Sequence, residues 1–456
     1  MTTTTHTTEI IVVGMGPAGE AVAGQLAEAG LDVVGIDREL VGGECPYWGC
    51  VPSKMMIRAA HLLAEARRIP GMAGKAEVTP DWGPVAARIR AEATDDWDDT
   101  VAVERFEGKG GRFVRGEGRI VGPGRVEVGG RVYEATKGIV IATGTRAAVP
   151  PIPGLADTPY WTNREAIAAA ELPASMIVLG GGAIGVELAQ VYARFDVAVT
   201  IVEANDRLLP LEEPEAGALV GTVFADEGID VRVGVGAASV AYDSGAFTVT
   251  LADGAELRAE QLLVATGRRT DLAGLGVAAI GIDDTARALP VDEHLRVGDG
   301  VWAVGDITGK GAFTHVGMYQ AAIAVADILG NEHRPASYAA LPRVTFADPE
   351  VGSVGMTEAQ AREAGVEVAT ALVQVPHTAR GWLHKTGNEG IIKLVADAAS
   401  GTLVGATAAG PNGGEVLGLL ALAVHAQVPV TELRSMIWAY PTFHRGIEDA
   451  VNALDL

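Results

Sequence analysis

Two cysteines are the residues of this 456-residue chain whose type and spacing best suit chemistry. Cys45 and Cys50 are its only cysteines, and both lie in the segment GGECPYWGC, residues 42–50. The chain starts MTTTTHTTE, which lacks the basic and apolar regions of a secretory signal, and we expect a disordered tail there. No apolar run is long enough to span a membrane. We therefore expect a cytoplasmic protein, in which two neighbouring cysteines indicate redox or metal chemistry.

The overall charge narrows the choice of partners. The formal net charge is −23 at pH 7. Such a surface repels nucleic-acid phosphates and anionic lipids, so we expect neither nucleic acid nor a membrane as a partner. The length of the chain predicts about two to four domains.

A second chemical feature is a glycine pattern that occurs twice. Residues 9–37 and residues 176–203 each contain an apolar run, the pattern G-x-G-x-x-G, a stretch with helical spacing, and a β-rich run that ends in an acid. The acid follows the first glycine by 23 positions in both segments. This layout predicts two strand–turn–helix units that bind dinucleotides. The glycines are Gly14, Gly16 and Gly19 in the first segment and Gly180, Gly182 and Gly185 in the second.

Each position of the pattern has a physical task. The first glycine permits the tight turn, the second lets the backbone approach a pyrophosphate, and the third lets the helix pack against the strand. The anion lies at the helix N-terminus, and the acid accepts hydrogen bonds from ribose hydroxyls. We therefore expect Asp37 and Glu203 to bind ribose. Two such units suggest a bound flavin and a diffusing nicotinamide.

The second acid predicts which nicotinamide is used. A carboxylate at Glu203 favours a free ribose 2′-hydroxyl and repels a 2′-phosphate. The following residues offer only Arg207 as a partner for such a phosphate. We therefore expect NADH to be preferred over NADPH.

Further strands surround these two units. Apolar runs end in ATG at residues 142–144 and 265–267, which places Gly144 and Gly267 among the expected cofactor-binding residues, and a third run ends at Asp306. Prolines at positions 150, 151 and 153 predict a linker. From about residue 341 the pattern changes to strands of an antiparallel sheet flanked by helices. The predicted fold class is α/β, with two Rossmann-like dinucleotide-binding domains followed by an α+β domain.

These residues together resemble the FAD-dependent pyridine nucleotide-disulfide oxidoreductases, a family that includes dihydrolipoamide dehydrogenase and the glutathione, mycothione and mercuric reductases. The resemblance extends from about Glu9 to the C-terminus. Its most specific part is GGECPYWGCVPSK, residues 42–54, which is similar to the family's redox-active disulfide motif. It implies a homodimer with an FAD-binding domain (1–150), an NAD-binding domain (151–271), a central domain that completes the FAD site (272–340) and a C-terminal interface domain (341–456).

The resemblance also implies roles for single residues. Cys50 matches the thiol beside the flavin, and Cys45 matches the interchange thiol that faces the substrate. Lys54 matches a lysine near the flavin N5 atom, with Glu187 as its partner. Asp306 matches the residue that bonds the sugar chain of the flavin.

The five-residue spacing of the cysteines has a geometric consequence. A disulfide needs Cα atoms about 4.4–6.8 Å apart, which positions i and i+5 of a regular helix do not provide. We therefore expect an irregular turn that enters a helix, where a thiolate is stabilised and nucleophilic. A zinc site would need about four ligands, and a staple across so short a loop would stabilise little. We predict no metal site, and a structural role for His315 and His425.

The C-terminal motif departs from the family. The family has a His-Pro pair and, shortly after it, a Glu, which together serve the interchange thiol as acid and base. The segment AYPTFHRGIEDA, residues 439–450, has Tyr440 at the histidine position and Arg445 at the glutamate position. A histidine shuttles protons at neutral pH, whereas a tyrosine is a poor base. Either His444 supplies the proton transfer from a shifted position, or the substrate needs no such transfer and His444 is a surface residue of a helix.

Three functional hypotheses follow. The first is an NAD(P)H-dependent flavoprotein oxidoreductase that uses NADH, FAD and the Cys45–Cys50 pair to reduce a small-molecule disulfide other than lipoamide or glutathione. The second keeps FAD and NADH but reduces quinones, metal ions or oxygen, and its thiols only tune the flavin. The third is a non-catalytic flavin-bound sensor, which has no need of a second nucleotide site.

Overall fold

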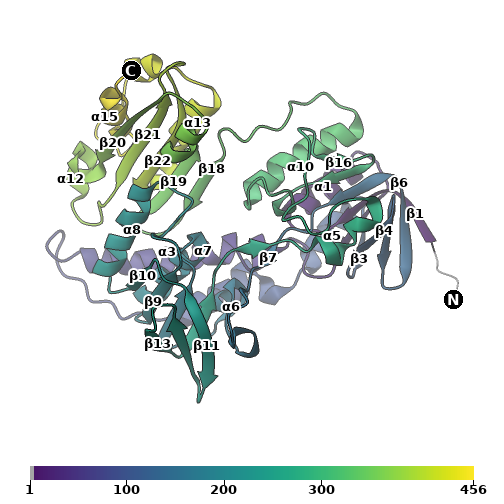
Figure 1. Ribbon diagram of the computed structural model, residues 1–456, viewed down its shortest axis with the longest axis horizontal. Coiled ribbons are helices and arrows are strands. Elements are labelled where there is room, and N and C mark those ends of the chain that lie inside the picture. Colours follow the sequence, from purple (N-terminus) through teal and green to yellow (C-terminus); the bar gives the residue numbers. More distant parts are fainter. Residues whose placement is uncertain (1–4) are drawn as a thin grey trace. The chain divides into compact units, whose positions relative to one another are not determined.

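The structure is a computed structural model that describes residues 5–456 (Figure 1). The chain divides into two compact units, each built from three segments. The first unit consists of residues up to 52, 87–148 and 268–337, and the second of residues 53–86, 149–267 and 338–456. The chain thus passes between units within four residues of the boundaries predicted after 150, 271 and 340. The inclusion of 53–86 in the second unit was not predicted, and the division into four domains stays a prediction.

The first unit is built on an eight-stranded sheet with a parallel centre. Strands β1, β2, β3, β6 and β17 pair in parallel in the order β17-β6-β1-β2-β3, and β16, β4 and β5 add antiparallel pairs. The central strands β1, β2, β6 and β17 contain continuous buried apolar runs, as expected for strands covered on both faces of a sheet. The strands are β1 (Thr5–Val13), β2 (Val33–Asp37), β3 (Arg112–Arg115), β4 (Arg119–Gly122), β5 (Arg125–Val128), β6 (Arg131–Ile141), β16 (Arg296–Gly298) and β17 (Val301–Ala303).

The start of β1 corrects the prediction of a disordered tail. Residues 1–4 lie outside the described residues, but Thr5 to Glu9 belong to the strand. Thr5 to Thr8 pair in parallel with residues 132–135 of β6. Threonine is β-branched and favours extended backbone, so a segment with little apolar character still extends the strand when a partner strand is available.

Helices pack against this sheet, and their apolar side chains form a hydrophobic core with those of the strands. Helices α1 and α10 pack against each other. One cluster of buried apolar side chains joins α1, α10 and α5 to the central strands, and a second lies under β4 and β5. The helices of this unit are α1 (Pro17–Glu28), α2 (Glu44–Tyr47), α5 (Thr100–Gly108), α9 (Leu272–Leu275) and α10 (Thr314–Leu329), and a short ladder joins β7 (Arg146–Ala147) to β15 (Arg268–Arg269). Helix α3 (Cys50–Arg68) starts in this unit and continues into the second.

The second unit repeats the parallel design and adds two antiparallel sheets. Its parallel sheet has the order β10-β9-β8-β14, and a separate sheet has the order β11-β12-β13. The elements are α6 (Asn163–Ala168), β8 (Ser175–Leu179), α7 (Ala183–Arg194), β9 (Ala198–Glu203), α8 (Pro214–Asp226), β10 (Asp230–Val233), β11 (Ala237–Asp243), β12 (Ala246–Leu251), β13 (Glu256–Ala259) and β14 (Gln261–Val264).

The C-terminal part of the second unit is the predicted antiparallel sheet. Its order is β18-β19-β22-β21-β20, and helix α13 packs on β22 and β19. The most hydrophobic stretch of the sequence lies in α13, where Leu417, Leu420 and Ala423 are buried. The elements are β18 (Pro342–Thr345), β19 (Glu350–Gly355), α11 (Glu358–Glu363), β20 (Val368–Gln374), α12 (Ala379–His384), β21 (Ile391–Asp397), β22 (Thr402–Gly410), α13 (Gly413–His425), α14 (Val430–Ser435) and α15 (Gly446–Ala453).

This architecture confirms the predicted fold class. Two parallel sheets follow the two glycine patterns, and an antiparallel sheet with helices follows residue 341. Among residues 5–456, none of the helices combines the length and the apolar character that crossing a membrane requires.

Candidate redox and dinucleotide sites

The first glycine pattern forms a tight turn between β1 and α1. Gly14 has a φ of +94°, and a Cβ atom there would lie 2.4 Å from the carbonyl oxygen of Ala142. A Cβ atom on Gly19 would lie 1.9 Å from the carbonyl oxygen of Gly14. Side chains at these positions would push the helix and the neighbouring strand away, so both glycines are required by packing. Gly16, by contrast, has only the Cα of Gly43 near its Cβ position, at 3.9 Å.

The second pattern repeats this geometry between β8 and α7. Gly180 has a φ of +109°, and its Cβ atom would lie 2.4 Å from the carbonyl oxygen of Ala265. A Cβ atom on Gly185 would lie 2.0 Å from the carbonyl oxygen of Gly180, whereas the space at Gly182 is open to 4 Å. The first and third glycines are thus fixed by the protein itself, and the second leaves room for a ligand.

The first turns of both helices contain backbone amides that suit an anion, although the first residue of α1, Pro17, has no N–H. Gly16 precedes α1 and Gly182 precedes α7, and a glycine has no side chain that could accept a hydrogen bond from the first helical amides. The helix dipole adds positive potential at the same place. The two turns therefore fit the pyrophosphate groups of two dinucleotides.

The acids at the ends of β2 and β9 are bonded to these turns. Asp37 accepts a hydrogen bond of 2.6 Å from the amide of Met15, the residue between the first two glycines. Glu203 accepts one of 2.6 Å from the amide of Gly181, at the same position of the second pattern. Asp37 also accepts from the amide of Glu39. The acids therefore brace the glycine turns, a role that the sequence analysis did not identify.

Burial shifts the pKa of Asp37, the acid of the first turn. Desolvation raises the pKa of Asp37 above its ordinary value, against the opposing effect of the hydrogen bonds from Met15 and Glu39. In the second unit, Glu203 is buried, and its other oxygen accepts from the amide and the side chain of Asn205. Arg207 donates to Asp206 and to the carbonyl of Pro210, so its charge is already compensated.

The two cysteines lie on the predicted irregular turn. Cys45 is in α2, a helix of only four residues, and the chain then turns at Trp48 and Gly49 before Cys50 opens α3. A Cβ atom on Gly49 would lie 3.1 Å from the carbonyl oxygen of Glu44, which keeps the turn tight. Both cysteines are thiols in the structure, Cys45 half-buried and Cys50 exposed. The Sγ atom of Cys50 lies 3.5 Å from the hydroxyl of Thr314, the first residue of α10.

The two glycines before this motif attach it to the first glycine turn. The amide of Gly42 donates a hydrogen bond of 2.7 Å to the carbonyl of Met15. Gly43 has a φ of +64°, and a Cβ atom there would lie 2.8 Å from the Cα of Gly16. The thiol motif and the first dinucleotide turn are therefore one packed structure, and the repeated glycine in GGEC is its sequence signal.

A polar network that includes Asp306 lies in the same unit. Thr145 donates a hydrogen bond of 2.8 Å to Asp306, and Arg268 donates to both the hydroxyl and the carbonyl of Thr145. Arg268 also lies 3.7 Å from a carboxylate oxygen of Glu44, next to Cys45. Sequence reasoning missed Thr145 and Arg268, although each directly follows one of the two ATG segments and so could have been found as a second pair of repeats.

The adjacent ATG glycines, Gly144 and Gly267, have φ values of +62° and +111°. Their Cβ positions have no neighbour within 4 Å. Backbone conformation, and not packing, therefore selects glycine at both positions.

The predicted pair of Lys54 and Glu187 is present in the second unit. The ammonium of Lys54 lies 2.8 Å from Glu187 and 4.7 Å from the ring centre of Phe346. The other oxygen of Glu187 accepts a hydrogen bond of 2.8 Å from the amide of Phe346. Helix α3 carries Lys54 four residues, about one turn, after Cys50. Phe346 is a further residue of this arrangement that the sequence analysis did not single out.

The altered C-terminal motif is largely open. Tyr440 is 70% exposed, and the guanidinium of Arg445 lies 5.4 Å from the centre of its ring. Arg445 is paired with Glu448 at 3.0 Å. His444 lies before α15, with its Nε2 atom 3.4 Å from the hydroxyl of Thr442. His444 thus contacts the side chain of Thr442, in the turn that follows Tyr440.

Comparisons with known proteins agree with this geometry. Residues 8–326 match the family model "Pyridine nucleotide-disulphide oxidoreductase", and residues 341–451 match the dimerisation domain of the same family. The chain is 35% identical to a mercuric reductase of Shigella flexneri, over 98% of this chain and 80% of that protein. It is 34% identical to a dihydrolipoyl dehydrogenase of Chlorobaculum tepidum, over 97% of this chain and 96% of that protein.

Solved structures show the same likeness. The HOCl-induced flavoprotein disulfide reductase RclA from Escherichia coli superposes with a TM-score of 0.85 at 27% identity, covering 97% of this chain and 99% of that one. LpdA from Mycobacterium tuberculosis gives a TM-score of 0.85 at 26% identity, covering 98% and 99%. The chain therefore belongs to the pyridine nucleotide-disulphide oxidoreductase family.

Proposed function

We propose that the protein is an NADH-dependent FAD disulfide oxidoreductase that uses Cys45 and Cys50 as an exchanging dithiol. The observation that carries this proposal is the placement of the two thiols on the turn between α2 and α3, with Cys50 at a helix start beside Thr314. Gly42 and Gly43 of the same motif pack on the first glycine turn. The family is one of flavoprotein oxidoreductases that use FAD and NAD(P)H. The dimerisation domain at 341–451 supports a homodimer.

The cofactor sites fit the residues that the structure offers. The turn at Gly14, Gly16 and Gly19 would hold the FAD pyrophosphate, with Asp37 at the ribose and Asp306 at the sugar chain of the flavin. The turn at Gly180, Gly182 and Gly185 would hold the nicotinamide dinucleotide, with Glu203 at the ribose. Bound FAD would supply two-electron chemistry between the nicotinamide and the thiols.

The chain's own residues then account for exchange with a substrate disulfide. The Cys45 thiolate attacks one substrate sulfur and displaces the other as a thiolate, which takes up a proton. The Cys50 thiol, losing its proton, attacks Cys45 in this mixed disulfide and releases the second substrate thiol. The Cys45–Cys50 pair is thereby oxidised by two electrons and the substrate reduced by two. The positive end of α3 stabilises the Cys50 thiolate.

The altered C-terminal motif bears on the identity of the electron acceptor. Tyr440 and Arg445 replace the family's acid/base pair, so we infer that the substrate is neither lipoamide nor glutathione. A second function, reduction of a metal ion, is favoured by the replacement of the family's acid/base pair by Tyr440 and Arg445, because transfer to a metal ion needs no base for a leaving thiol. Mercuric reductases are among the relatives, and a Cu(II) complex of RclA has been solved.

An anaerobic NADH titration of the FAD-loaded enzyme tests the proposal. We expect a long-wavelength absorption band, due to a thiolate beside oxidised flavin, to appear in the wild type after addition of two electrons. In Cys45→Ser the band should be present before NADH is added and should disappear as NADH reduces the flavin, and in Cys50→Ser it should be absent. Disulfide turnover should fall at least 100-fold in Cys45→Ser, while reduction of ferricyanide is retained. Disulfide turnover that is unchanged in Cys45→Ser would refute exchange at this thiol. Metal-ion turnover that survives loss of both thiols would favour the second function.

A further inference from the structure

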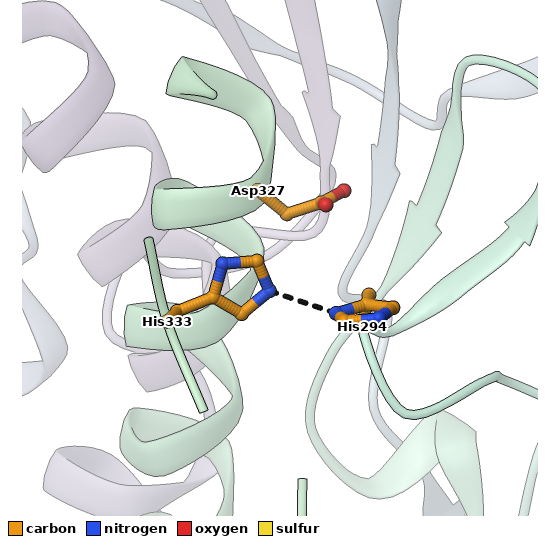
Figure 2. Close-up of side chains that lie close together, drawn as sticks. All are labelled: His294, Asp327 and His333. Carbon is orange, nitrogen blue, oxygen red and sulfur yellow. Dashed lines mark hydrogen bonds between the residues drawn. The ribbon is translucent and has the colours of Figure 1, made fainter. Parts of the chain in front are cut away.

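Three side chains in the first unit converge at a place far from the redox pair. Ligand atoms of His294, Asp327 and His333 all lie within 4.8 Å of one another (Figure 2). His294 precedes β16, Asp327 lies near the end of α10, and His333 follows that helix. All three are half-buried, so the cluster is ordered by its surroundings and still accessible to solvent. Sequence reasoning predicted no metal site and did not single out these residues. The two histidines are 39 positions apart and occur in no metal-binding motif.

The two imidazoles face each other through one nitrogen each. The Nδ1 atom of His294 lies 2.9 Å from the Nε2 atom of His333 (Figure 2). The Nδ1 atom of His333 lies 3.0 Å from the carbonyl oxygen of Asn331. A carbonyl only accepts, so His333 carries its proton on Nδ1 and presents a lone pair on Nε2. This carbonyl contact is the outer partner that metal-binding histidines usually have.

The far nitrogen of His294 also has a polar neighbour. Its Nε2 atom lies 3.7 Å from a carboxylate oxygen of Glu293. The contact between Nδ1 of His294 and Nε2 of His333 is a hydrogen bond of 2.9 Å. A metal ion bound at about 2.0–2.1 Å from both nitrogens would replace this hydrogen bond after a small opening of the pair.

The carboxylate has one acceptor position left. Arg296 donates to both oxygens of Asp327, at 2.7 Å to Oδ2 and 2.9 Å to Oδ1, and the indole of Trp302 donates to Oδ2 at 2.7 Å. Two carboxylate oxygens offer about four lone-pair positions, so three are used and one remains on Oδ1. The two donors fix the orientation of the carboxylate, as outer partners of a metal ligand do.

We propose that His294, His333 and Asp327 bind a divalent transition-metal ion of the zinc, cobalt, nickel or copper type. Two imidazoles and one carboxylate are a ligand set that such ions favour over magnesium or calcium, and water would complete the coordination. The metal would join the end of α10 to the loop before β16.

The site is separate from the redox pair. Thr314, which contacts Cys50, opens α10, and Asp327 lies thirteen residues later in the same helix. At 1.5 Å per residue, about 20 Å separates the two places along the helix axis. The bound ion therefore acts on the stability of the first unit and takes no part in thiol chemistry.

Cobalt and zinc binding to the FAD-loaded enzyme test this site. The measurement uses a Cys45→Ser/Cys50→Ser background, so that thiolates do not bind the metal. We expect one Co²⁺ per chain, with visible absorption bands typical of nitrogen and oxygen ligands, and a Zn²⁺-dependent rise of the unfolding temperature. Loss of an outer partner alone weakens a metal site by about 10–100-fold, so His294→Ala and His333→Gln should weaken binding by at least that much.

His425→Ala is the matched control, because His425 is an exposed histidine at the end of α13 and outside the cluster. It should bind as the background does. Each variant should retain its flavin and, in the absence of metal, unfold at the same temperature as the background protein. These two measurements show that the variants fold. Unchanged Co²⁺ affinity in both cluster variants, or one-to-one binding that needs the cysteines, would overturn the proposal. Failure of the background protein to bind Co²⁺ or Zn²⁺ at millimolar concentration would overturn it as well.

Discussion

Substitution of Glu203 tests the proposal that the second unit binds NADH in preference to NADPH. The carboxylate accepts three hydrogen bonds within the protein, one from Gly181 and two from Asn205. About one of its four lone-pair positions is left to accept from a ribose hydroxyl. Glu203→Ala removes that acceptor and the negative charge together. The variant should therefore lose affinity for NADH and lose its discrimination against NADPH.

The size of both effects can be worked out. A hydrogen bond to a charged group contributes about 1.5–3 kcal/mol, which corresponds to about 10–150-fold in kcat/KM for NADH. A unit charge about 4 Å from a phosphate charge, at an effective dielectric constant of about 20, costs about 4 kcal/mol, and the substitution removes this repulsion from NADPH binding. Screening by salt reduces the second effect. The ratio of kcat/KM for NADH to that for NADPH should fall by at least about 100-fold.

The assay is steady-state reduction of ferricyanide with each nucleotide, at two salt concentrations. Asp37→Ala is the matched control, because Asp37 has the same bond to the middle of its glycine turn in the first unit. It should weaken FAD retention and leave the nucleotide ratio unchanged. A wild-type preference for NADPH, or an equal loss of both activities in Glu203→Ala, would refute the reasoning.

Two further predictions concern stability. Lys393 is buried and lies within 3.0 Å of Glu213, Glu215 and Glu358. Burial lowers the pKa of Lys393, but the three carboxylates raise it by more, so that the net shift of the pKa is upward. Lys393→Met should reduce the free energy of unfolding by about 3–5 kcal/mol, measured by denaturant titration at pH 7, because it leaves the carboxylates without their buried partner. Adding Glu213→Gln should recover part of the lost stability. A loss below about 1 kcal/mol in Lys393→Met would contradict the importance of this ion cluster. Burial lowers the pKa of His61 below its ordinary 6.5. The unfolded chain then binds this proton at higher pH than the folded one, so His61 contributes fully above about pH 6.5, and its contribution falls as pH drops from 6.5 through the folded pKa. His61→Gln should flatten the dependence of unfolding free energy between pH 7.5 and 5.5, and an unchanged slope would exclude this group.

Features set by local sequence were predictable. The tight turns at Gly14 and Gly180 need positive φ angles and have them, and an irregular turn separates Cys45 from Cys50. In each case the residue types and their spacing carry the constraint, because the interacting atoms lie within a few positions of one another. The roles of these residues toward flavin, nicotinamide and substrate stay predictions.

Features set by pairing between distant segments were not predictable. Thr5 to Thr8 form a strand because β6 extends beside them. Arg268 reaches Thr145 across 123 positions, and His294 reaches His333 across 39. Neither the register of a strand nor the direction of a side chain at the end of a helix is encoded in a local pattern. Such contacts depend on the order of the strands in the sheet. The sequence constrains that order only through the glycine pattern that occurs twice.

The two glycine turns are not exact copies of each other. They differ in the residue between the first two glycines, and neighbouring side chains adjust to this difference in each turn. In the first turn this residue is Met15, whose side chain is fully buried. A Cβ atom on Gly35 would lie only 2.6 Å from the sulfur atom of Met15, so the methionine occupies the space above Gly35. In the second turn the middle residue is Gly181, and a Cβ atom there would lie 2.6 Å from Cδ2 of Leu208 and 3.1 Å from the Cβ of Glu203. The space is thus filled once in each unit, by the middle side chain in the first turn and by Leu208 together with Glu203 in the second. The acid of the second turn therefore has a packing role beside the ribose contact predicted for it, and sequence spacing alone does not reveal that packing role.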